Sequence, residues 1–345
     1  FPMLDETADT IAALHSHQLV TTLAGSWIAQ SLSVIARLGV ADVLAKGPQT
    51  IEAIASRTGC HAPALYRILR ALASVDVFAE RDGLIFELTP KAELLRSDHP
   101  HSLHAYAVMV GSQWIWNSWT DLEFSVKSGK AAFDKVFGEP VFQYYAGHPD
   151  AARCSVEGLG NRGRRENKLI VEAFDFSRAG SIMDVGGGQG GLLAEIASRS
   201  PDSKCILFDR QPVIDAARSR WPAENAGRID FISGDFFQSM PSGIDVYLMK
   251  KVLHDWSDEQ AGEILRICRE AIPDDGCLLV IDQVVPVGNQ PSYAKLLDLL
   301  MLVLTGGRER TAAEHEKLLA TADFRLISIK PLMSSLCLIE ARPEC

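Results

Sequence analysis

The sequence lacks the features that mark disulfide-rich, zinc-binding and nucleic-acid-binding proteins. Its 345 residues include seven cysteines, an odd number without a Cys-x-x-Cys pair, so we expect reduced thiols and neither a disulfide framework nor a metal site. Positive charge is in deficit, because the net charge is -10 at pH 7. Since binding to phosphates requires a basic surface, we expect no nucleic acid as the main partner.

Long apolar runs are also missing. No apolar run reaches the ~18 residues that a membrane span needs, so we expect no membrane partner. Residues 1–6 lack the basic and apolar segments of a signal peptide. Hydrophobic residues make up 47% and charged residues 23% of the chain, as in ordinary globular proteins, and 345 residues are many for one core. These properties predict a cytoplasmic enzyme or binding protein with two domains.

The first hundred residues have the pattern of a winged helix. Apolar residues at helical spacing predict helices over 24–38, 51–57 and 62–75, and Thr50 is placed to cap the second of them. Residues 77–88 then predict a hairpin with an Asp-Gly turn. Helix, turn, helix and hairpin in this order are typical of a winged helix, which serves either DNA binding or dimerisation.

Charge favours dimerisation over DNA binding. Residues 1–100 contain eight Lys and Arg against eleven Asp and Glu, and the helix predicted over 62–75 carries Arg67 and Arg70 as its only cations. A helix that reads DNA is normally basic. We therefore expect a dimerisation domain, with a DNA-binding regulator as the less favoured alternative.

The stretch 103–175 is predicted to be helical and is rich in aromatic residues. Most such side chains pack in cores or between helices. Trp114 and Trp116 are the candidates for the wall of a pocket that holds a flat ligand.

From residue 181 onward, strands alternate with helices. Strands are predicted over 181–185, 204–208, 229–233, 246–249, 277–284, 325–332 and 335–342. Helices are predicted between them, over 192–199, 213–220, 259–271, 294–304 and 312–322. This alternation predicts a doubly wound parallel sheet, and the two-residue connection between the last strands predicts an antiparallel edge.

A glycine-rich loop follows the first of these strands. Residues 186–191 satisfy the pattern Gly-x-Gly-x-x-Gly, with Gly186 and Gly188 as its first two glycines. Asp209 follows Gly188 by 21 residues at the end of the second strand, the position from which a carboxylate commonly binds a ribose hydroxyl. The loop therefore predicts NAD or another adenosine cofactor.

Asp184 distinguishes between these cofactors. A carboxylate beside the glycine turn repels a pyrophosphate, whereas it suits S-adenosylmethionine, which carries a sulfonium and an ammonium group. Asp235 and Phe236 follow the third strand and offer a carboxylate for an exocyclic amine and a ring for stacking on adenine. We therefore expect S-adenosylmethionine as the cofactor and S-adenosylhomocysteine as its product.

His254 is the candidate base. It ends an apolar run that begins at residue 245, and ligands of open α/β sheets bind at the carboxyl ends of strands. Methyl transfer to a phenol requires loss of a proton, and a neutral imidazole accelerates it by ~10²–10⁴-fold when it accepts that proton. A carboxylate on the other ring nitrogen fixes the tautomer, and both Asp282 and Glu309 are candidates for it. Asp255 and Asp258 are more typical of a helix N-terminus.

At this point the chain resembles the metal-independent small-molecule O-methyltransferases, the family of plant caffeate-type and bacterial antibiotic-tailoring enzymes. The resemblance extends over nearly the whole length. It rests on the winged-helix pattern and on the motifs at 184–190, 207–209, 234–237, 249–250, 253–258 and 306–311.

The resemblance implies roles for these residues. His254 would be the general base, flanked by Asp282 and Glu309. The N-terminal domain would form an intertwined homodimer and contribute residues to the partner's substrate pocket. The cofactor would be held by Asp184, Gly186, Gly188, Asp209, Asp235, Phe236 and Lys250. The candidate substrate-pocket residues are Trp114, Trp116, Leu159, Asp255 and Met301.

The chain departs from the family pattern in three places. Relatives commonly have glutamate at the position of Asp282, and the shorter side chain favours Glu309 as the partner of His254. A Phe-x-x-x-Met pair of relatives is replaced by Ser155 and Leu159, so the substrate does not carry over. The loop before Gly306 is shorter than in the plant enzymes, which favours a bacterial tailoring role.

The sequence thus predicts a methyltransferase that acts on a hydroxyl of an aromatic secondary metabolite such as a polyketide or phenazine. Methylation of nitrogen or carbon, or another reaction on the same scaffold, stays open as an alternative. The expected fold is a Rossmann-like doubly wound sheet with an antiparallel edge strand, as in class I methyltransferases, preceded by an all-helical, winged-helix-like dimerisation domain. The expected regions are a dimerisation domain over 1–102, a helical region lining the substrate pocket over 103–175 and the catalytic domain over 176–345.

Overall fold

The chain folds into two compact units. A computed structural model describes residues 5–221 and 227–344. The first unit comprises Phe1–Trp116 and Pro149–Arg162, and the second comprises Asn117–His148 and Gly163–Cys345. The stretch 103–175 is thus shared between the units, and the division at residues 102 and 175 stays a prediction.

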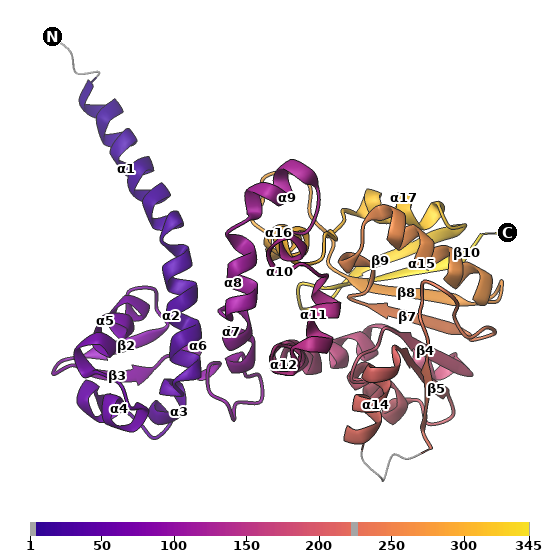
Figure 1. The fold of residues 1–345 in the computed structure, drawn as a ribbon, viewed down its shortest axis with the longest axis horizontal. Coiled ribbons are helices and arrows are strands. Elements are labelled where there is room, and N and C mark those ends of the chain that lie inside the picture. The colour runs from indigo at the N-terminus through magenta and orange to yellow at the C-terminus, as the bar shows by residue number, and fades with distance from the viewer. Residues whose placement is uncertain (1–4, 222–226, 345) are drawn as a thin grey trace. The chain divides into compact units, whose positions relative to one another are not determined.

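The first unit contains helices and a small sheet (Figure 1). Its helices before residue 111 are α1 (Asp5–Leu23), α2 (Gly25–Arg37), α3 (Val40–Leu44), α4 (Ile51–Thr58), α5 (Ala62–Ala73), α6 (Pro90–Glu93) and α7 (His104–Val110). Thr50 caps α4, since its hydroxyl accepts the N–H of Ala53 at 3.3 Å, and Gly59 ends the helix with φ 68°. The core of this unit includes Ile35, Ile54, Leu69, Leu72 and Phe86, all fully buried.

The predicted hairpin is present and pairs with a third strand. β2 (Phe78–Arg81) and β3 (Ile85–Leu88) are antiparallel, and β3 also pairs with β1 (Gln49–Thr50) in the order β1-β3-β2. The sequence does not predict β1, because two residues carry no periodicity. The sheet places a wing beside the helices, as the pattern predicts.

One helical stretch of the first unit is more apolar than expected. Thr10–Arg37 has a mean hydropathy of 1.4 over its most apolar window, and by length and composition it is able to cross a membrane. The expectation that no segment reaches this length is therefore wrong. The mean hydropathy averages over the polar residues of the window, whereas an apolar run ends at each of them. Length and composition alone do not distinguish a membrane span from a packed helix.

Four short helices and one long helix follow along the chain. They are α8 (Gln113–Trp119), α9 (Leu122–Ser128), α10 (Ala132–Phe137), α11 (Val141–Gly147) and α12 (Pro149–Ala173), followed by the 3-10 turn η1 (Phe176–Arg178). Helices α8 and α12 each continue from one unit into the other.

The second unit contains a seven-stranded sheet of order β6-β5-β4-β7-β8-β10-β9. Its strands are β4 (Ser181–Val185), β5 (Lys204–Asp209), β6 (Ile229–Ser233), β7 (Val246–Lys250), β8 (Cys277–Asp282), β9 (Phe324–Pro331) and β10 (Cys337–Pro343). The first five are parallel, whereas β10 is antiparallel to both β8 and β9. The predicted doubly wound sheet with an antiparallel edge is confirmed.

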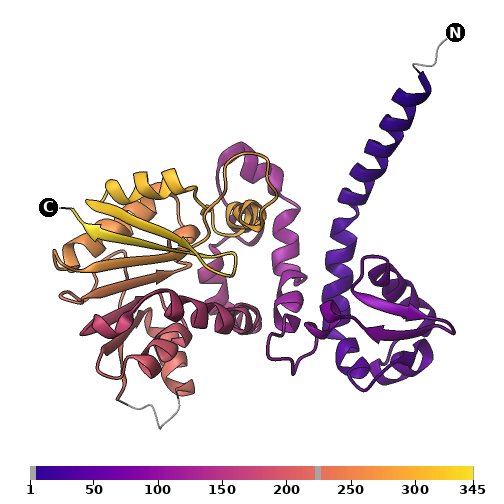
Figure 2. The same cartoon turned by 180° about the vertical axis from the view of Figure 1, so that it is seen from behind.

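Helices cover both faces of this sheet (Figures 1 and 2). Successive residues of each strand alternate between two cores because the side-chain period of a strand is two. Met183, Ile206 and Tyr247 pack with α15 (Asp258–Ala271) and α17 (Ala312–Ala320). Ile182, Leu207 and Leu248 pack with α13 (Gly191–Arg199) and α14 (Gln211–Arg220). Burial on both faces explains why these strands are uninterrupted apolar runs in the sequence.

Candidate active site

His254 lies just beyond the carboxyl end of β7. The chain leaves the strand at Lys251, whose φ is 55°, and forms the 3-10 turn η3 (Leu253–Asp255). Helix α15 begins directly afterwards, capped by Ser257, whose hydroxyl accepts the N–H of Gln260 at 3.3 Å. The imidazole is therefore held between a strand end and a capped helix, and His254 is 8% exposed.

Glu309 is the hydrogen-bond partner of His254. Nδ1 of the ring lies 2.7 Å from Oε1 of Glu309, whose side chain is fully buried. A carboxylate only accepts hydrogen bonds, so it fixes the proton of the neutral imidazole on Nδ1. Nε2 is then free to accept a proton, with Oδ1 of Asp255 3.8 Å away. Glu309 is thus not a solvated loop charge.

Hydrogen bonds join the segments 253–256 and 307–310 around this pair. The N–H of Arg308 donates to the carbonyl of His254 at 2.9 Å. The buried guanidinium of Arg310 donates to the carbonyls of Leu253 at 2.9 Å and Trp256 at 3.0 Å. A Cβ at Gly307 would lie 2.1 Å from the carbonyl oxygen of His254, so the two backbones approach too closely for any other residue.

Asp282 lies near His254 without a hydrogen bond to it. It ends β8 and is 1% exposed, and neither carboxylate oxygen has a hydrogen-bond partner among the described residues. Burial raises the pKa of Asp282 to about 7, against the attraction of His254. Of the two candidate acids, Glu309 makes the direct contact.

The acids also set the basicity of the imidazole. Burial lowers the pKa of His254, but the charge of Asp255, the hydrogen bond to Glu309 and the charge of Asp282 together raise it to about 9. Such a group is a stronger base than free histidine, and it carries a proton at neutral pH.

The glycine loop after β4 has the backbone of a tight turn. Gly186, Gly188 and Gly190 have φ values of 66°, 58° and 72°, which favour glycine. The N–H of Gly186 donates to the carbonyl of Phe208 at 2.8 Å. A Cβ at Gly187 would lie 2.6 Å from the carboxylate of Asp184, so the loop rests directly on that side chain.

Asp209 is bound to the same loop. Its Oδ2 accepts the N–H of Gly188 at 3.0 Å, and its Oδ1 accepts the N–H of Arg210 at 2.7 Å. Burial raises the pKa of Asp209, and these two hydrogen bonds oppose the rise. The carboxylate is thereby fixed at the strand end from which a ribose is bound in nucleotide-binding sheets.

Asp184 lies against the glycine loop, and Lys250 ends β7, the strand beside β4. Asp184 is 1% exposed, its Oδ1 has no hydrogen-bond partner in the described parts of the chain, and burial raises its pKa to about 7. Burial also lowers the pKa of Lys250 to about 8. The ammonium of Lys250 donates to Asn167 at 2.7 Å and lies 3.4 Å from Glu166. Sequence reasoning missed Asn167 and Glu166, because only the folded chain brings α12 beside β7.

Phe236 lies beside the glycine loop and belongs to a series of neighbouring aromatic rings. Phe236 lies 3.6 Å from the position of a Cβ on Gly186, and its ring centroid is 6.1 Å from that of Trp256. Phe142 on α11 is 5.9 Å from Trp256 by ring centroids, and the guanidinium of Arg210 lies over it at 5.8 Å. The sequence did not single out Phe142. Asp235 stays exposed, and its Oδ1 accepts the N–H of Phe237 at 2.9 Å.

These features fit a cationic adenosine cofactor. The positive-φ glycines let a ligand approach the backbone closely, and Asp184 offers an unpartnered buried oxygen. Asp184 and Asp209 supply the negative charge that a sulfonium requires. Among the described residues no group of His, Cys, Asp and Glu is arranged to hold a metal ion.

The candidate substrate-pocket residues are divided between the units. Trp114 is 7% exposed and Leu159 is 49% exposed, and both belong to the first unit, as does Trp116. Met301 is buried in α16 (Tyr293–Leu304), and Asp255 adjoins His254, both in the second unit. Their role as a common pocket stays a prediction.

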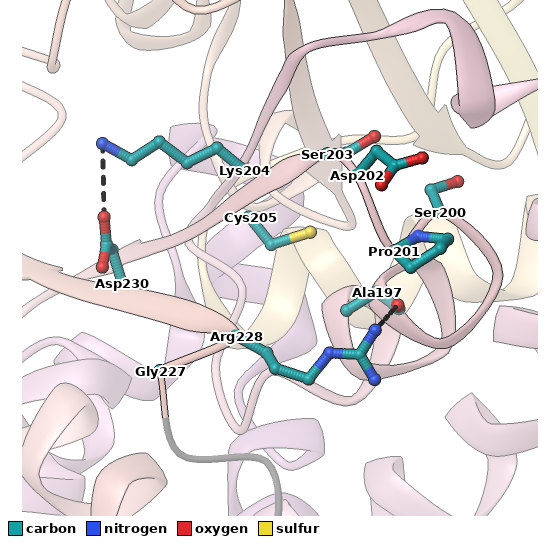
Figure 3. A pocket seen from close by; sticks show the side chains of 10 residues that line it. All are labelled: Ala197, Ser200, Pro201, Asp202, Ser203, Lys204, Cys205, Gly227, Arg228 and Asp230. Atoms are coloured by element: carbon teal, nitrogen blue, oxygen red, sulfur yellow. Dashed lines mark hydrogen bonds and ion pairs between the residues drawn. The ribbon is translucent and has the colours of Figure 1, made fainter.

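A separate cavity of about 320 Å³ lies at the opposite end of the sheet, where β5 begins (Figure 3). Its charged side chains include two with partners already in place, since Lys204 pairs with Asp230 at 3.3 Å and Arg228 donates to the carbonyl of Ala197 at 3.1 Å. This cavity is remote from the strand ends that carry His254 and Asp209, and it plays no part in the site.

Comparison with known families gives two matches. The profile of the O-methyltransferase domain matches residues 119–325. The profile of the O-methyltransferase dimerisation domain matches residues 20–98.

Individual relatives agree with the family match. The phenazine O-methyltransferase PhzM of Lysobacter antibioticus is 42% identical over 94% of this chain and 95% of its own. The 8-amino-8-demethylriboflavin N,N-dimethyltransferase of Streptomyces davaonensis is 34% identical, covering 91% of this chain and 92% of its own. The O-methyltransferase NcsB1 from neocarzinostatin biosynthesis, solved with S-adenosyl-L-homocysteine and 1,4-dihydroxy-2-naphthoic acid, aligns with a TM-score of 0.77 at 30% identity, covering 91% of this chain and 95% of NcsB1.

Proposed function

This chain belongs to the S-adenosylmethionine-dependent O-methyltransferase family, and from that premise we propose that it methylates a hydroxyl of an aromatic secondary metabolite with His254 as general base. The observation that carries the proposal is the hydrogen bond from Nδ1 of His254 to Glu309, which leaves Nε2 able to accept a proton. Asp255, Asp282 and Glu309 raise the pKa of the imidazole, which strengthens it as a proton acceptor.

The chemistry divides between the cofactor and the protein. When bound, S-adenosylmethionine supplies a methyl group on a sulfonium, and the acceptor oxygen takes it as the carbon–sulfur bond breaks, leaving S-adenosylhomocysteine. His254 accepts the hydroxyl proton at Nε2 as the oxygen–carbon bond forms. Glu309 stabilises the imidazolium that results and keeps the ring oriented.

The glycine loop and its neighbours are proposed to hold the cofactor. Asp209 would bind the ribose hydroxyls, and Asp235 and Phe236 would bind the amine and the face of the adenine ring. Asp184 and Lys250 would face the charged amino acid part. The backbone of Gly186 and Gly188 would lie against the cofactor. Support comes from the geometry of the loop and from the S-adenosyl-L-homocysteine bound to NcsB1.

We expect the acceptor to be a fused aromatic ring such as a phenazine or an aromatic polyketide. One relative is named a phenazine O-methyltransferase. Another, NcsB1, was solved with a dihydroxynaphthoic acid. Trp114, Trp116, Leu159, Asp255 and Met301 are the residues proposed to line its pocket. Methylation of an aromatic amine is the second candidate, because a relative at 34% identity is named an N,N-dimethyltransferase.

The assembly is proposed to be a homodimer formed through the N-terminal domain. The dimerisation profile matches residues 20–98, and the helices of that unit expose large apolar side chains. The cysteines of the described chain are free thiols, in keeping with the predicted cytoplasmic location.

Incubation with isotope-labelled S-adenosylmethionine and a panel of hydroxylated and aminated phenazines and naphthoates tests this function. Mass spectrometry then locates the label. We expect the methyl group on an oxygen of a fused-ring phenol. Labelling of amines alone would replace the proposal with N-methylation, and no labelling of any member would contradict the acceptor class.

A further inference from the structure

Asp298 holds the residue that orients the proposed base. It lies on α16, and its Oδ1 accepts the backbone N–H of Glu309 at 2.8 Å. Its side chain is half-buried, and burial raises the pKa of Asp298. The contact joins residues eleven positions apart, across the turn after α16.

Hydrogen bonds also fix the backbone on both sides of Glu309. Arg308 is fixed through its N–H to the carbonyl of His254, and the carbonyl of Arg310 accepts the N–H of Val285 at 2.9 Å. Thr311 then caps α17 in a capping box with Glu314. Glu309 lies between these fixed points, and the one backbone donor of Glu309 itself is bound by Asp298.

We propose that Asp298 is a positioning residue for the methyl transfer, which acts by fixing the backbone of Glu309 so that its carboxylate meets Nδ1 of His254. The proposal rests on the proposed roles of His254 and Glu309. It also links the base to α16, the helix that carries the candidate pocket residue Met301.

The expected effect follows from the geometry. A hydrogen bond of 2.7 Å tolerates little displacement, and misplacement of a catalytic group by ~1 Å costs about 10²-fold in rate. Asp298→Ala removes the acceptor, so we expect kcat to fall by about 10- to 10²-fold while the KM for S-adenosylmethionine stays unchanged. Asp298→Asn keeps an oxygen acceptor at the same place and should restore most of kcat.

The pH profile separates positioning from general structural support. Release of Glu309 weakens its hold on the imidazolium and lowers the pKa of His254, so the limb on which kcat rises with pH should move to lower pH in Asp298→Ala. The charged groups that act on Asp298 are Arg308, Glu309 and Glu314, and those that act on His254 are Asp255, Asp282 and Glu309. None of them is altered by the substitution.

A double-mutant cycle gives the decisive result. If Asp298 acts through Glu309, Asp298→Ala combined with Glu309→Gln should be no slower than Glu309→Gln alone. Lys295→Ala is the control on the same helix, because its ammonium contacts the carbonyl of Gln290 at 2.9 Å and not Glu309.

The outcomes distinguish failure of the role of Asp298 from failure of the pairing between His254 and Glu309. If Glu309→Gln lowers kcat and Asp298→Ala does not, or if their effects multiply, the role of Asp298 is wrong and the proposed function stands. If Glu309→Gln leaves kcat unchanged, the proposed pair itself is wrong. Circular dichroism of each variant before assay confirms that it is folded, and Asp298→Asn supplies the comparison should Asp298→Ala fail to fold.

Discussion

At the scale of single residues, the site is built to make one imidazole unusually basic. A pKa of about 9 for His254 approaches the pKa of ~10 of a phenol, so proton transfer between them is nearly balanced in free energy. Basicity also has a cost, because at pH 7 most of the imidazole carries a proton on Nε2. Catalysis should therefore depend on the small deprotonated fraction.

We predict that kcat/KM for the acceptor rises with pH through neutrality, with its midpoint near pH 9, where His254 loses its proton, and levels above that pH. In Glu309→Gln the imidazolium loses a charged hydrogen bond, its pKa falls, and the limb moves to lower pH. Initial rates at saturating cofactor across this pH range measure the rising limb in the wild type and in Glu309→Gln. A limb that stays in place in Glu309→Gln would contradict the pairing.

Sequence reasoning identified the residues that stand at strand ends. His254 and Asp209 were predictable because an apolar run that stops at a polar side chain places it at the carboxyl edge of the sheet. Glu166, Asn167 and Phe142 were not predictable, since their own segments show ordinary helical polarity and only tertiary packing brings them to the loop. The departure of Asp282 from the family glutamate was visible in the sequence, whereas its lack of a hydrogen-bond partner among the described residues follows only from the fold.

At the scale of elements, the contact between the turn at 306–311 and the turn η3 brings Glu309 to His254. Gly307 allows it, because the backbone of His254 occupies the place of a side chain. The sequence predicted the strands to within a few residues, since buried parallel strands are apolar throughout. It did not resolve α8 to α11, because helices of six or seven residues span less than two full turns.

Gly307→Ala should separate these two turns. Its Cβ would meet the carbonyl of His254 at 2.1 Å, so the backbone must shift, at a cost of about 1–3 kcal/mol in stability. We expect turnover to fall together with the unfolding midpoint in urea. Gly147→Ala, with no atom within 4 Å of the new Cβ, is the control. Normal turnover in Gly307→Ala would show that the close contact does not position His254.

At the scale of the whole molecule, the first unit leaves large apolar side chains exposed. Helices α1 and α2 expose apolar side chains, among them Leu14 at 55%, Leu23 at 68% and Trp27 at 73%. An apolar patch of this kind marks an interface. The same residues raise the hydropathy of Thr10–Arg37, and we propose that a second copy of the chain covers them, because the dimerisation profile matches residues 20–98.

We predict that the protein is a dimer in solution, with twice the chain mass of 37.7 kDa. Leu23→Glu should weaken the dimer, because the carboxylate would be buried without a partner in the interface. Light scattering coupled to gel filtration measures both masses. A monomeric wild-type protein, or one that sediments with lipid vesicles, would contradict the assignment of this surface.

The central claim is that His254 removes the proton of the acceptor. Its most direct test compares single-turnover rates of the wild type and His254→Ala on a series of phenols of decreasing pKa. We predict a loss of about 10²–10⁴-fold for phenols that are protonated at the assay pH, a loss that shrinks for phenols already ionised, and unchanged affinity for S-adenosylmethionine. Equal rates of the two proteins on a protonated phenol would contradict the claim.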